Sequence, residues 1–509
     1  MQIPVVDIFA GPGGLGEGFS AFTTRRAPKH PPFKIAVSAE MEENAARTLR
    51  LRAFFRQFPA GRAPDSYYEY VAGRRTTPYT DATHAQWIAA DEEARQLRLG
   101  DPLDDAELKK RILQVVKKDQ PWVLIGGPPC QAYSLVGRAR NRGISGYRPE
   151  NDHRYFLYKQ YLKLINEFRP AAFVMENVKG ILSAKLDGEL VFPEIVESLE
   201  HPGGRGGPRY RIIPLMVPQT ELLTSQLQLD PRSYVLRAEA LGVPQARHRV
   251  VLLGLAEGLD ASRGQVLSPY EQHFSVLQVI GGLPRLRSGT TDMKIDRWSD
   301  TAAELLDSTA RAAVRHPETA RLLEKFANSA SKQRDPGQGG RWMQKTAKSD
   351  TVPEHLKSWL LDPRLDGILN HEVRSHMRQD LKRYAYASAF ASVHDRSPRG
   401  AEEFPFELHP KHKNWKSGKF VDRFKVQLGN FPSSTVTSHL AKDGHYFIHP
   451  DPSQLRSLSV REAARLQTFP DNYFFEGSRG AQFRQVGNAV PPWMARQIAG
   501  VVYSFLVDG

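Results

Sequence analysis

Short apolar runs alternate with longer amphipathic stretches through the first 170 residues of the chain. Such alternation is typical of a mostly parallel sheet with helices on its faces. Strands are expected at residues 3–9, 33–38, 122–125 and 171–175, and helices at 15–22, 42–58 and 152–168. The pattern therefore predicts an α/β fold.

The pattern of expected strands and helices is interrupted in two later parts of the chain. Residues 60–120 are longer than a simple crossover needs, which predicts a helical insertion in a first domain of residues 1–261. Residues 262–454 lose the sheet pattern and are polar and basic, which predicts a second domain. In residues 455–509, Ser459 with Glu462 reads as a capping box, and Pro492 is expected to open a last amphipathic helix.

Composition narrows the partners that the chain can have. Of the 509 residues 40% are hydrophobic, which suffices for buried cores and excludes disorder as the main state. The 70 Lys and Arg exceed the 56 Asp and Glu by 14, and this surplus favours a polyanionic partner, most simply nucleic acid. Cys130 is the single cysteine, which excludes an intrachain disulfide. The histidines of the second domain lack a tight pair spacing, so no metal site is expected.

The distribution of apolar residues bears on where in the cell the protein is located. The chain begins almost directly on an apolar run, without a basic segment ahead of a long apolar stretch, so we expect no signal peptide. It has no run of 18 apolar residues, so we expect no membrane-spanning helix. Both observations favour a cytoplasmic protein.

A glycine-rich segment joins the first expected strand to the first helix. Gly11, Gly13, Gly14 and Gly16 lie there, in an order that matches G-x-G-x-x-G. Glycines let the backbone approach a ligand, and a helix N-terminus offers free N–H groups. Glu40 ends the next strand, which is the usual place of an acid that binds ribose hydroxyls. The segment predicts a site for an adenosine-containing cofactor, a dinucleotide or S-adenosylmethionine, and a turn without a ligand is the alternative.

A Gly-Gly-Pro-Pro loop carries Cys130 at the end of the third strand. Ligands of open α/β sheets bind outside the carboxyl ends of the strands, so the thiol is placed where a nucleophile is useful. A small buried thiol is the commoner fate of a free cysteine, but such a loop is a poor way to fill a core. The basic, glycine-containing segment 134–150 that follows predicts a flap or an ordinary solvated loop.

Two further polar groups are expected at the same edge. Glu176 and Asn177 end the fourth strand. Arg247 and Arg249 come just before a strand at residues 250–253, and if that strand is antiparallel its start lies at this edge. Both arginines could then hold an anion or a carbonyl oxygen.

In this order the blocks resemble the DNA (cytosine-5) methyltransferase family. They comprise residues 7–14, Glu40, residues 127–131, 176–178, 245–249, 461–470 and 485–492. The resemblance implies a Rossmann-like, S-adenosylmethionine-dependent methyltransferase sheet and a second, mixed target recognition domain at residues 262–454. It also implies that residues 455–509 form a hinge and a C-terminal segment that complete the catalytic domain.

The resemblance assigns roles to the polar groups. Cys130 is implied to be the thiolate that adds to C6 of cytosine, and Glu176 to hydrogen-bond the ring at N3 and N4. Arg249 is implied to contact the cytosine carbonyl or the Cys130 loop, and Arg247 to steady the same edge.

S-adenosylmethionine is the implied cofactor. The residues implied to bind it are Phe9, Ala10, Gly11, Gly13, Gly14, Leu15, Glu40, Met41, Pro129, Asn488, Ala489 and Val490. The family also uses an aspartate against the adenine, and here both Asp81 and Asp101 are candidates.

Duplex DNA is the implied partner, with the target cytosine flipped out of the helix. Contacts to DNA are expected from Gln131, Ser134, Arg138, Arg140, Arg341, Trp342, Trp415 and Lys416. We expect a monomer on DNA, associated with the nucleoid and paired with a cognate restriction endonuclease, in restriction–modification or phage defence. An RNA (tRNA) cytosine-5 methyltransferase and a catalytically silent DNA-binding regulator are the alternatives.

Overall fold

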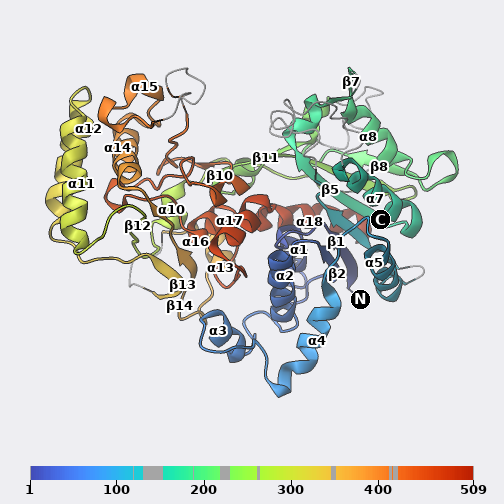
Figure 1. Cartoon of the computed structure of the whole chain (residues 1–509). Coiled ribbons are helices and arrows are strands. Elements are labelled where there is room, and N and C mark those ends of the chain that lie inside the picture. The colour runs from blue at the N-terminus through green and yellow to red at the C-terminus, as the bar shows by residue number, and fades with distance from the viewer. Residues whose placement is uncertain are drawn as a thin grey trace.

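The computed structural model shows two lobes side by side, and the last part of the chain returns from the second lobe to the first (Figure 1). The structure describes residues 2–117, 120–129, 153–186, 188–217, 230–260, 264–345, 351–411, 415 and 422–507. Within these residues no helix combines the length and apolar character needed to cross a bilayer.

A mixed, mostly parallel sheet forms the centre of the first lobe. Its strand order is β3-β2-β1-β4-β5-β11-β8, with β9 also paired to β11. The strands span β1 Ile3–Ile8, β2 Phe33–Glu40, β3 Ala94–Gln96, β4 Val123–Gly126, β5 Ala172–Val178, β8 Tyr210–Ile213, β9 Val235–Arg237 and β11 His248–Ala256. All six residues of β1 are buried, as expected for a parallel strand covered on both faces. The α/β prediction is confirmed, and β11 is antiparallel to β5.

Helices cover both faces of this sheet. One face packs against α1 (Gly14–Ser20) and α18 (Pro492–Val507), which bury Phe19 and Met494 with Val5 of β1. The other face packs against α5 (Pro102–Val115), α7 (His153–Phe168) and α8 (Val191–Glu200). Because α18 comes from the end of the chain, the first lobe is discontinuous in sequence.

The expected helical insertion at residues 60–120 needs correction. Only α3 (Asp65–Val71), η1 (Asp81–Thr83) and α4 (His84–Glu93) stand outside the sheet layers. The rest of the range contains β3, which pairs in parallel with β2, and the crossover helix α5. Three residues with a polar majority give no strand pattern, which is why β3 escapes detection from the sequence.

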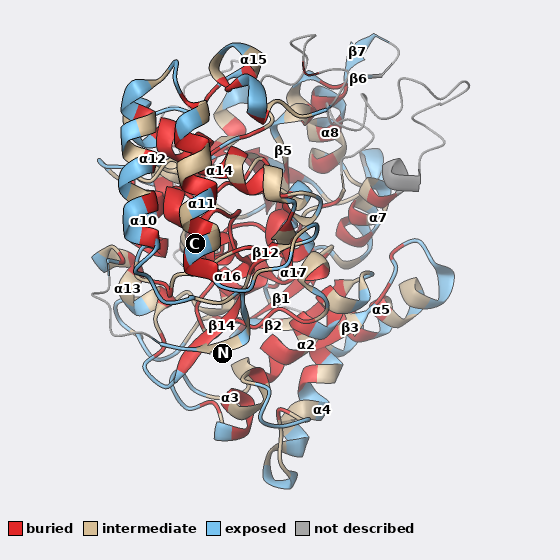
Figure 2. Cartoon of the chain, turned by 60° about the vertical axis from the view of Figure 1, so that its left-hand side comes forward, coloured by how far each residue is buried: buried red, intermediate tan, exposed pale blue. Residues whose placement is uncertain are grey.

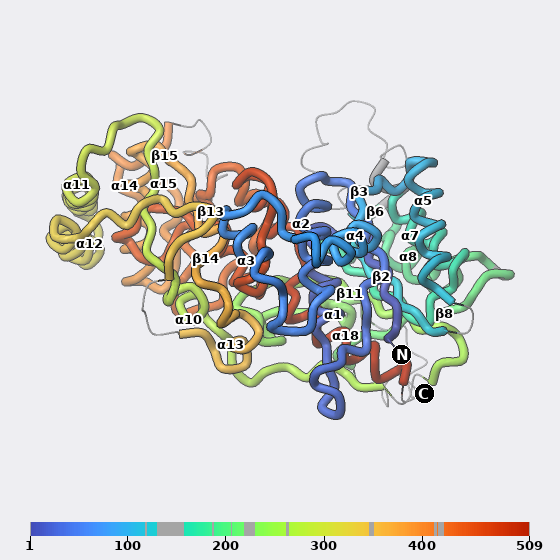
Figure 3. The backbone as a smooth tube through the Cα atoms, turned by 90° about the horizontal axis from the view of Figure 1, so that it is seen from below, coloured from blue at the N-terminus to red at the C-terminus, as the bar shows by residue number. Residues whose placement is uncertain are grey.

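The second lobe is built mainly from helices and short strand pairs, with its own hydrophobic core. The paired helices α11 (Trp298–Ala312) and α12 (Pro317–Ala330) form its outer edge and pack on α14 (Arg378–His394) (Figure 3). An antiparallel pair, β13 (Gly339–Gln344) and β14 (Gly367–Glu372), lies nearer the first lobe. Its other elements are α10 Val276–Ile280, β12 Gly289–Thr290, α13 Glu354–Leu360, β15 Ser375–His376, α15 Gly400–Glu403 and η7 Phe406–Leu408.

The part of the chain that returns to the first lobe, residues 455–507 and called the returning segment below, is buried along much of its length (Figure 2). The capping box of Ser459 and Glu462 opens α16 (Val460–Leu466), as expected, and α17 (Arg479–Asn488) and α18 follow. The remaining elements are the helix α2 Glu43–Arg56 and the short elements β6 Lys185–Leu186, β7 Glu189–Leu190, β10 Gln245–Ala246, β16 Ser433–Ser434, η3 Lys179–Ser183, η4 Gly204–Gly206, η5 Pro231–Tyr234, η6 Ala238–Leu241, η8 Ser438–Ala441 and η9 Pro452–Gln454.

The short strand β10 pairs with β16 and so ties the first lobe to the second.

A buried ion pair stabilises the start of α16. Arg456 donates through Nη2 to Glu462 Oε1 and through Nη1 to Oε2, both at 2.7 Å. Burial alone would raise the pKa of Glu462, but the Arg456 guanidinium outweighs it and holds this pKa below its usual range. We expect Glu462→Gln to lower the free energy of unfolding by about 3 kcal/mol, because it leaves a buried guanidinium without its counter-charge.

Urea denaturation followed by tryptophan fluorescence measures this loss. Glu354→Gln is the control, because Glu354 pairs with Lys357 at an exposed site and should change stability by less than about 0.5 kcal/mol. A similar loss in both variants would contradict a special role for the buried pair.

Candidate functional site

The glycine-rich loop bends sharply between β1 and α1. Phe9, Gly11 and Gly13 have φ values of 54°, 57° and 91°, the left-handed region that glycine adopts without strain. The loop is held from below, because the N–H of Gly11 donates to Glu40 Oε2 at 2.8 Å. A Cβ atom added at Gly11 would meet nothing within 4 Å, so the loop faces open space.

Glu40 lies at the end of β2, beside this loop. Its other oxygen, Oε1, accepts the N–H of Glu42 at 2.9 Å. Burial raises the pKa of Glu40 above its usual value, and the N–H groups of Glu42 and Gly11 offset part of that rise. The next residue, Met41, is 53% exposed, which leaves an apolar side chain free at the rim of the site.

The returning segment closes the other side of the loop. A Cβ atom at Gly14 would come within 2.1 Å of the carbonyl oxygen of Val490, so only glycine lets α1 approach this segment. Ala489 is buried and Asn488 is exposed beside them. The expected cofactor residues from both ends of the chain are therefore neighbours, with Leu15 buried in α1 beneath them.

Of the two acids expected against an adenine, the structure favours Asp101. It follows β3, whose Gln96 pairs with Glu40 in parallel register, so both acids follow adjacent strands at the same edge of the sheet. Its Oδ1 caps α5 by accepting the N–H of Leu103 at 3.0 Å. Asp81 opens η1 on the insertion, outside the sheet layers.

The end of β4 supports the segment that leads to Cys130. A Cβ atom at Gly127 would lie 2.9 Å from Glu176 Oε2, so the glycine lets the carboxylate pack against this loop. Asn177 donates through Nδ2 to the carbonyl of Pro128 at 3.3 Å. Pro129 is the last described residue there, and Cys130, Gln131, Ser134, Arg138 and Arg140 lie outside the described residues.

Glu176 and Arg249 form an ion pair across β5 and β11. The distance from Arg249 Nε to Glu176 Oε1 is 2.8 Å, and both side chains are 12% exposed. The pairing follows from the register, because Glu176 lies opposite Val251 and Arg249 is two residues away on the same face. The strand β11 is antiparallel to β5, which is the condition under which the sequence placed Arg249 at this edge, and this orientation brings the two groups together.

Arg247 does not join them, which corrects the expectation of a catalytic arginine at this position. Its side chain is 1% exposed, and Nη1 donates to the carbonyls of Val436 at 2.8 Å and Gly487 at 3.4 Å. Burial, with Arg249 nearby, lowers the pKa of Arg247 well below its usual value. Arg247 holds the start of β11 against Val436 of the second lobe and Gly487 of the returning segment.

Some of the residues expected to contact DNA are likewise held by contacts within the protein. Trp415 is 4% exposed and packs against the rings of Phe404 and Phe424, so the expectation of a DNA contact is corrected: it is a core residue. Arg341 donates to the carbonyls of Tyr70 and Val71 and thereby joins β13 to α3. Trp342 is half-buried beside it, and Lys416 lies outside the described residues.

Sequence reasoning missed two groups near the glycine loop. The Tyr473 hydroxyl donates to the carbonyl of Pro12, and its ring is buried. The Asp7 carboxyl lies against Gly16 of α1, and burial raises its pKa to about 8. An aromatic residue and an acid inside apolar stretches give no signal of these positions, which only the long-range packing reveals.

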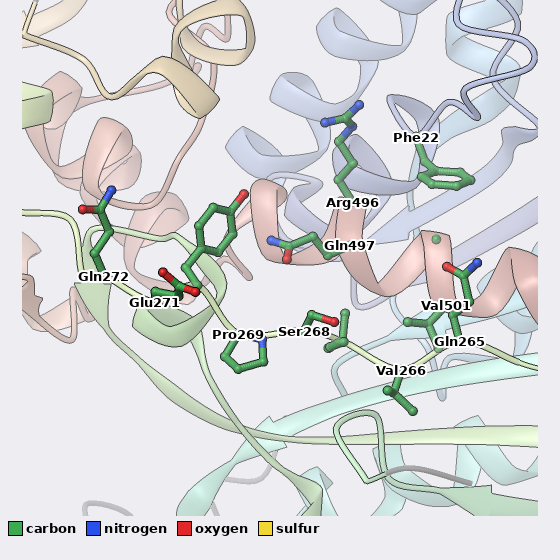
Figure 4. Close-up of a pocket in the computed structure, with 13 residues that line it drawn as sticks. Phe22, Gln265, Val266, Ser268, Pro269, Glu271, Gln272, Arg496, Gln497 and Val501 are labelled. Atoms are coloured by element: carbon green, nitrogen blue, oxygen red, sulfur yellow. The ribbon is translucent and has the colours of Figure 1, made fainter.

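A cavity of about 1050 Å³ opens elsewhere, between α18 and residues 265–272 (Figure 4). Phe22, just beyond the end of α1, and Arg496 and Gln497 of α18 line it. Because the glycine loop is at the opposite end of α1, this cavity is separate from the edge that carries Glu40 and Glu176.

Comparison with known proteins identifies the family of the chain. The family described as C-5 cytosine-specific DNA methylase matches residues 103–504. The chain belongs to this family. It is therefore an S-adenosylmethionine-dependent DNA cytosine-5 methyltransferase, as the resemblance implied.

Relatives of this methyltransferase cover nearly all of its length. It is 33% identical over 522 residues to the type II methyltransferase M.Bpa9945I of Bacillus paralicheniformis, with 98% of each chain covered. It is 24% identical to the type II methyltransferase M1.HphI of Haemophilus parahaemolyticus, over 99% of this chain and 87% of that one. A crystal structure of a prophage-encoded protein from E. coli shares the fold, with a TM-score of 0.52, 20% identity and 99% of both chains covered.

Proposed function

We propose that this methyltransferase modifies C5 of a cytosine flipped out of a specific duplex DNA sequence, through a covalent bond between Cys130 Sγ and C6. The observation that carries the proposal is the pair of Glu176 and Arg249, which packs against Gly127 three residues before the thiol. A carboxyl and a guanidinium at that place can bind the polar edge of a pyrimidine while a thiolate attacks its ring.

The chemistry follows from the poor nucleophilicity of C5. Addition of the Cys130 thiolate forms the Sγ–C6 bond and moves an electron pair onto C5, while Glu176 hydrogen-bonds N3 and the N4 edge. S-adenosylmethionine would supply the methyl group that C5 takes and would leave as S-adenosylhomocysteine. Loss of the C5 proton to water then returns the electron pair to the ring and expels the thiolate, which regenerates the enzyme.

The cofactor fits the edge of the sheet beside this pair. Open space over Gly11 accommodates a ligand against the loop, and Glu40 is placed to accept hydrogen bonds from ribose hydroxyls. We assign Asp101 to the adenine amino group and Met41 to the adenine face. The loop residues Phe9, Ala10, Gly13, Gly14 and Leu15, together with Pro129, Asn488, Ala489 and Val490, complete the proposed cofactor site.

Residues 262–454 are proposed to recognise the target sequence, and residues 455–509 to complete the catalytic domain of residues 1–261. The net charge of +14 suits contact with phosphates, and Arg341, Trp342, Gln131, Ser134, Arg138, Arg140 and Lys416 remain proposed DNA contacts. The type II names of the relatives support a place in restriction–modification. A cognate endonuclease and action as a monomer on cytoplasmic, nucleoid DNA are further parts of the proposal.

A duplex that carries 5-fluorocytosine at the target position tests the mechanism. Fluorine at C5 cannot leave as a proton does, so we expect a stable adduct whose mass equals protein plus methylated DNA strand. Because Cys130 is the single cysteine, peptide mapping assigns the bond without ambiguity. A tRNA substrate is the comparison: methyl transfer to tRNA and not to duplex DNA would overturn the proposal in favour of the RNA alternative.

A further inference from the structure

Two consecutive residues, Asn472 and Tyr473, lie between the cofactor loop and the second lobe. The Tyr473 hydroxyl donates to Pro12 of the glycine loop. A Cβ atom at Gly13 would lie 3.0 Å from the same oxygen. The conformation of the glycine-rich loop therefore depends on the position of the Tyr473 hydroxyl.

Asn472 fixes this segment from two sides. Its Oδ1 accepts Arg52 Nη1 at 2.9 Å, and its Nδ2 donates to Asp362 Oδ2 at 2.7 Å. Arg52 in turn donates through Nε to Glu17 Oε2 at 2.9 Å, and Glu17 belongs to α1, the helix that the glycine loop opens. One amide side chain thus joins the cofactor helix to an acid of the second lobe.

Asp362 gathers donors from three parts of the chain. It follows α13 in the second lobe, and its Oδ2 also accepts the hydroxyl of Tyr68 from α3 at 2.8 Å. Its Oδ1 accepts the N–H of Arg364 at 2.9 Å. A carboxylate that is only 8% exposed is stable when its oxygens are satisfied in this way, so its position is tightly fixed.

Arg461 makes a parallel connection between the same two regions. Its Nη2 donates to the carbonyl of Tyr473 at 2.6 Å, and its Nε donates to the carbonyl of Leu369 in β14 at 2.8 Å. The guanidinium is fully buried, which leaves these bonds little freedom to lengthen. A displacement of this part of the second lobe is consequently passed to the segment by two routes, from Asp362 to Asn472 and from Leu369 through Arg461 to Tyr473.

We propose that Asp362 and Tyr68 are positioning residues for the cofactor site, acting through Asn472 and Tyr473 on the glycine loop. None of the four side chains needs to touch the cofactor for this effect. Binding at the loop and the placement of the second lobe are then coupled, and such coupling is reciprocal. The inference rests on the proposed cofactor site at the glycine loop and not on the proposed covalent adduct.

The coupling between the second lobe and the cofactor site can be tested with variants that remove a hydroxyl or a carboxylate but keep the shape of the side chain. For Asp362→Asn and Tyr68→Phe in the full chain, we expect the Kd for S-adenosylhomocysteine, measured by calorimetry without DNA, to rise about fivefold. The KM for S-adenosylmethionine should rise equally and kcat should stay within about twofold, because no reacting group is altered.

Tyr70→Phe is the matched control. Tyr70 lies on the same helix as Tyr68 and likewise donates its hydroxyl to a carboxylate. Its acceptor is Glu476 Oε1 of the returning segment, at 2.7 Å, and this contact does not involve Asn472. We expect its Kd to stay within about 1.5-fold of the wild-type value, since the change lies off the coupled route. An unchanged Kd in Tyr68→Phe, or an equal rise in Tyr70→Phe, would overturn the proposal.

A double-mutant cycle separates coupling from general loosening. Tyr473→Phe alone should weaken binding of S-adenosylhomocysteine, because it removes the bond to Pro12. Combined with Asp362→Asn its effect should be clearly less than additive, whereas combined with Tyr70→Phe it should be additive. Additive effects in both combinations would show that Asp362 does not act through Tyr473.

Discussion

Cys130→Ala is expected to abolish methyl transfer while duplex DNA binding stays within about threefold of the wild type. The covalent route divides one difficult substitution at C5 into easier steps, and without a thiolate the ring has no activated carbon. The expected loss in kcat is at least about 10⁴-fold, comparable to removal of a nucleophile in other covalent enzymes. Incorporation of a labelled methyl group measures turnover, and a gel-shift titration measures binding.

The single cysteine gives this experiment an internal control. Alkylation with iodoacetamide should add one equivalent to the wild type and none to the variant, which verifies the thiol under test. Undiminished turnover in the variant would remove Cys130 from the mechanism. Loss of DNA binding and turnover together would instead point to a folding defect and leave no ground for the assignment.

Glu176→Gln is expected to lower kcat by about 10² to 10⁴-fold, the range for loss of a general acid or of a key electrostatic contact. The amide keeps the size of the side chain, so Gly127 can still pack against it. It cannot supply the proton or the negative charge that faces Arg249 Nε at 2.8 Å. Single-turnover methylation with saturating cofactor and DNA isolates this step.

Glu189→Gln serves as the control for that substitution. Glu189 lies exposed on β7 in the same lobe, and its replacement should leave kcat unchanged within error. A loss below tenfold in Glu176→Gln would contradict its role in activating the ring. A comparable loss in both variants would assign the effect to charge in general.

The sheet and the site edge could be predicted because their signals are local. Buried parallel strands are continuous apolar runs, so four of them are recognisable in the sequence, and Glu40 and Glu176 mark their ends. The strand β3 could not be found, since Ala94 is its only fully buried residue and its neighbours are polar or charged. Without β3 there was no reason to prefer Asp101 over Asp81.

Burial of polar and aromatic groups was the part that sequence could not supply. Arg247 and Arg249 are two residues apart and look equivalent in the sequence, yet Arg247 donates to the carbonyls of Val436 and Gly487 whereas Arg249 faces Glu176. Trp415 has lysines as sequence neighbours, which predicts a solvent-exposed position, whereas in the structure its ring packs against Phe404 and Phe424. Both outcomes depend on partners far away along the chain.

The packing of α18 on α1 has a consequence for how the enzyme is made. The helix α18, which covers one face of the first strands, follows the second lobe in sequence, so that face of the sheet stays uncovered during synthesis until α18 has been made. Exposed apolar strands favour aggregation, so we expect chains that stop before α18 to aggregate and not to complete the first lobe.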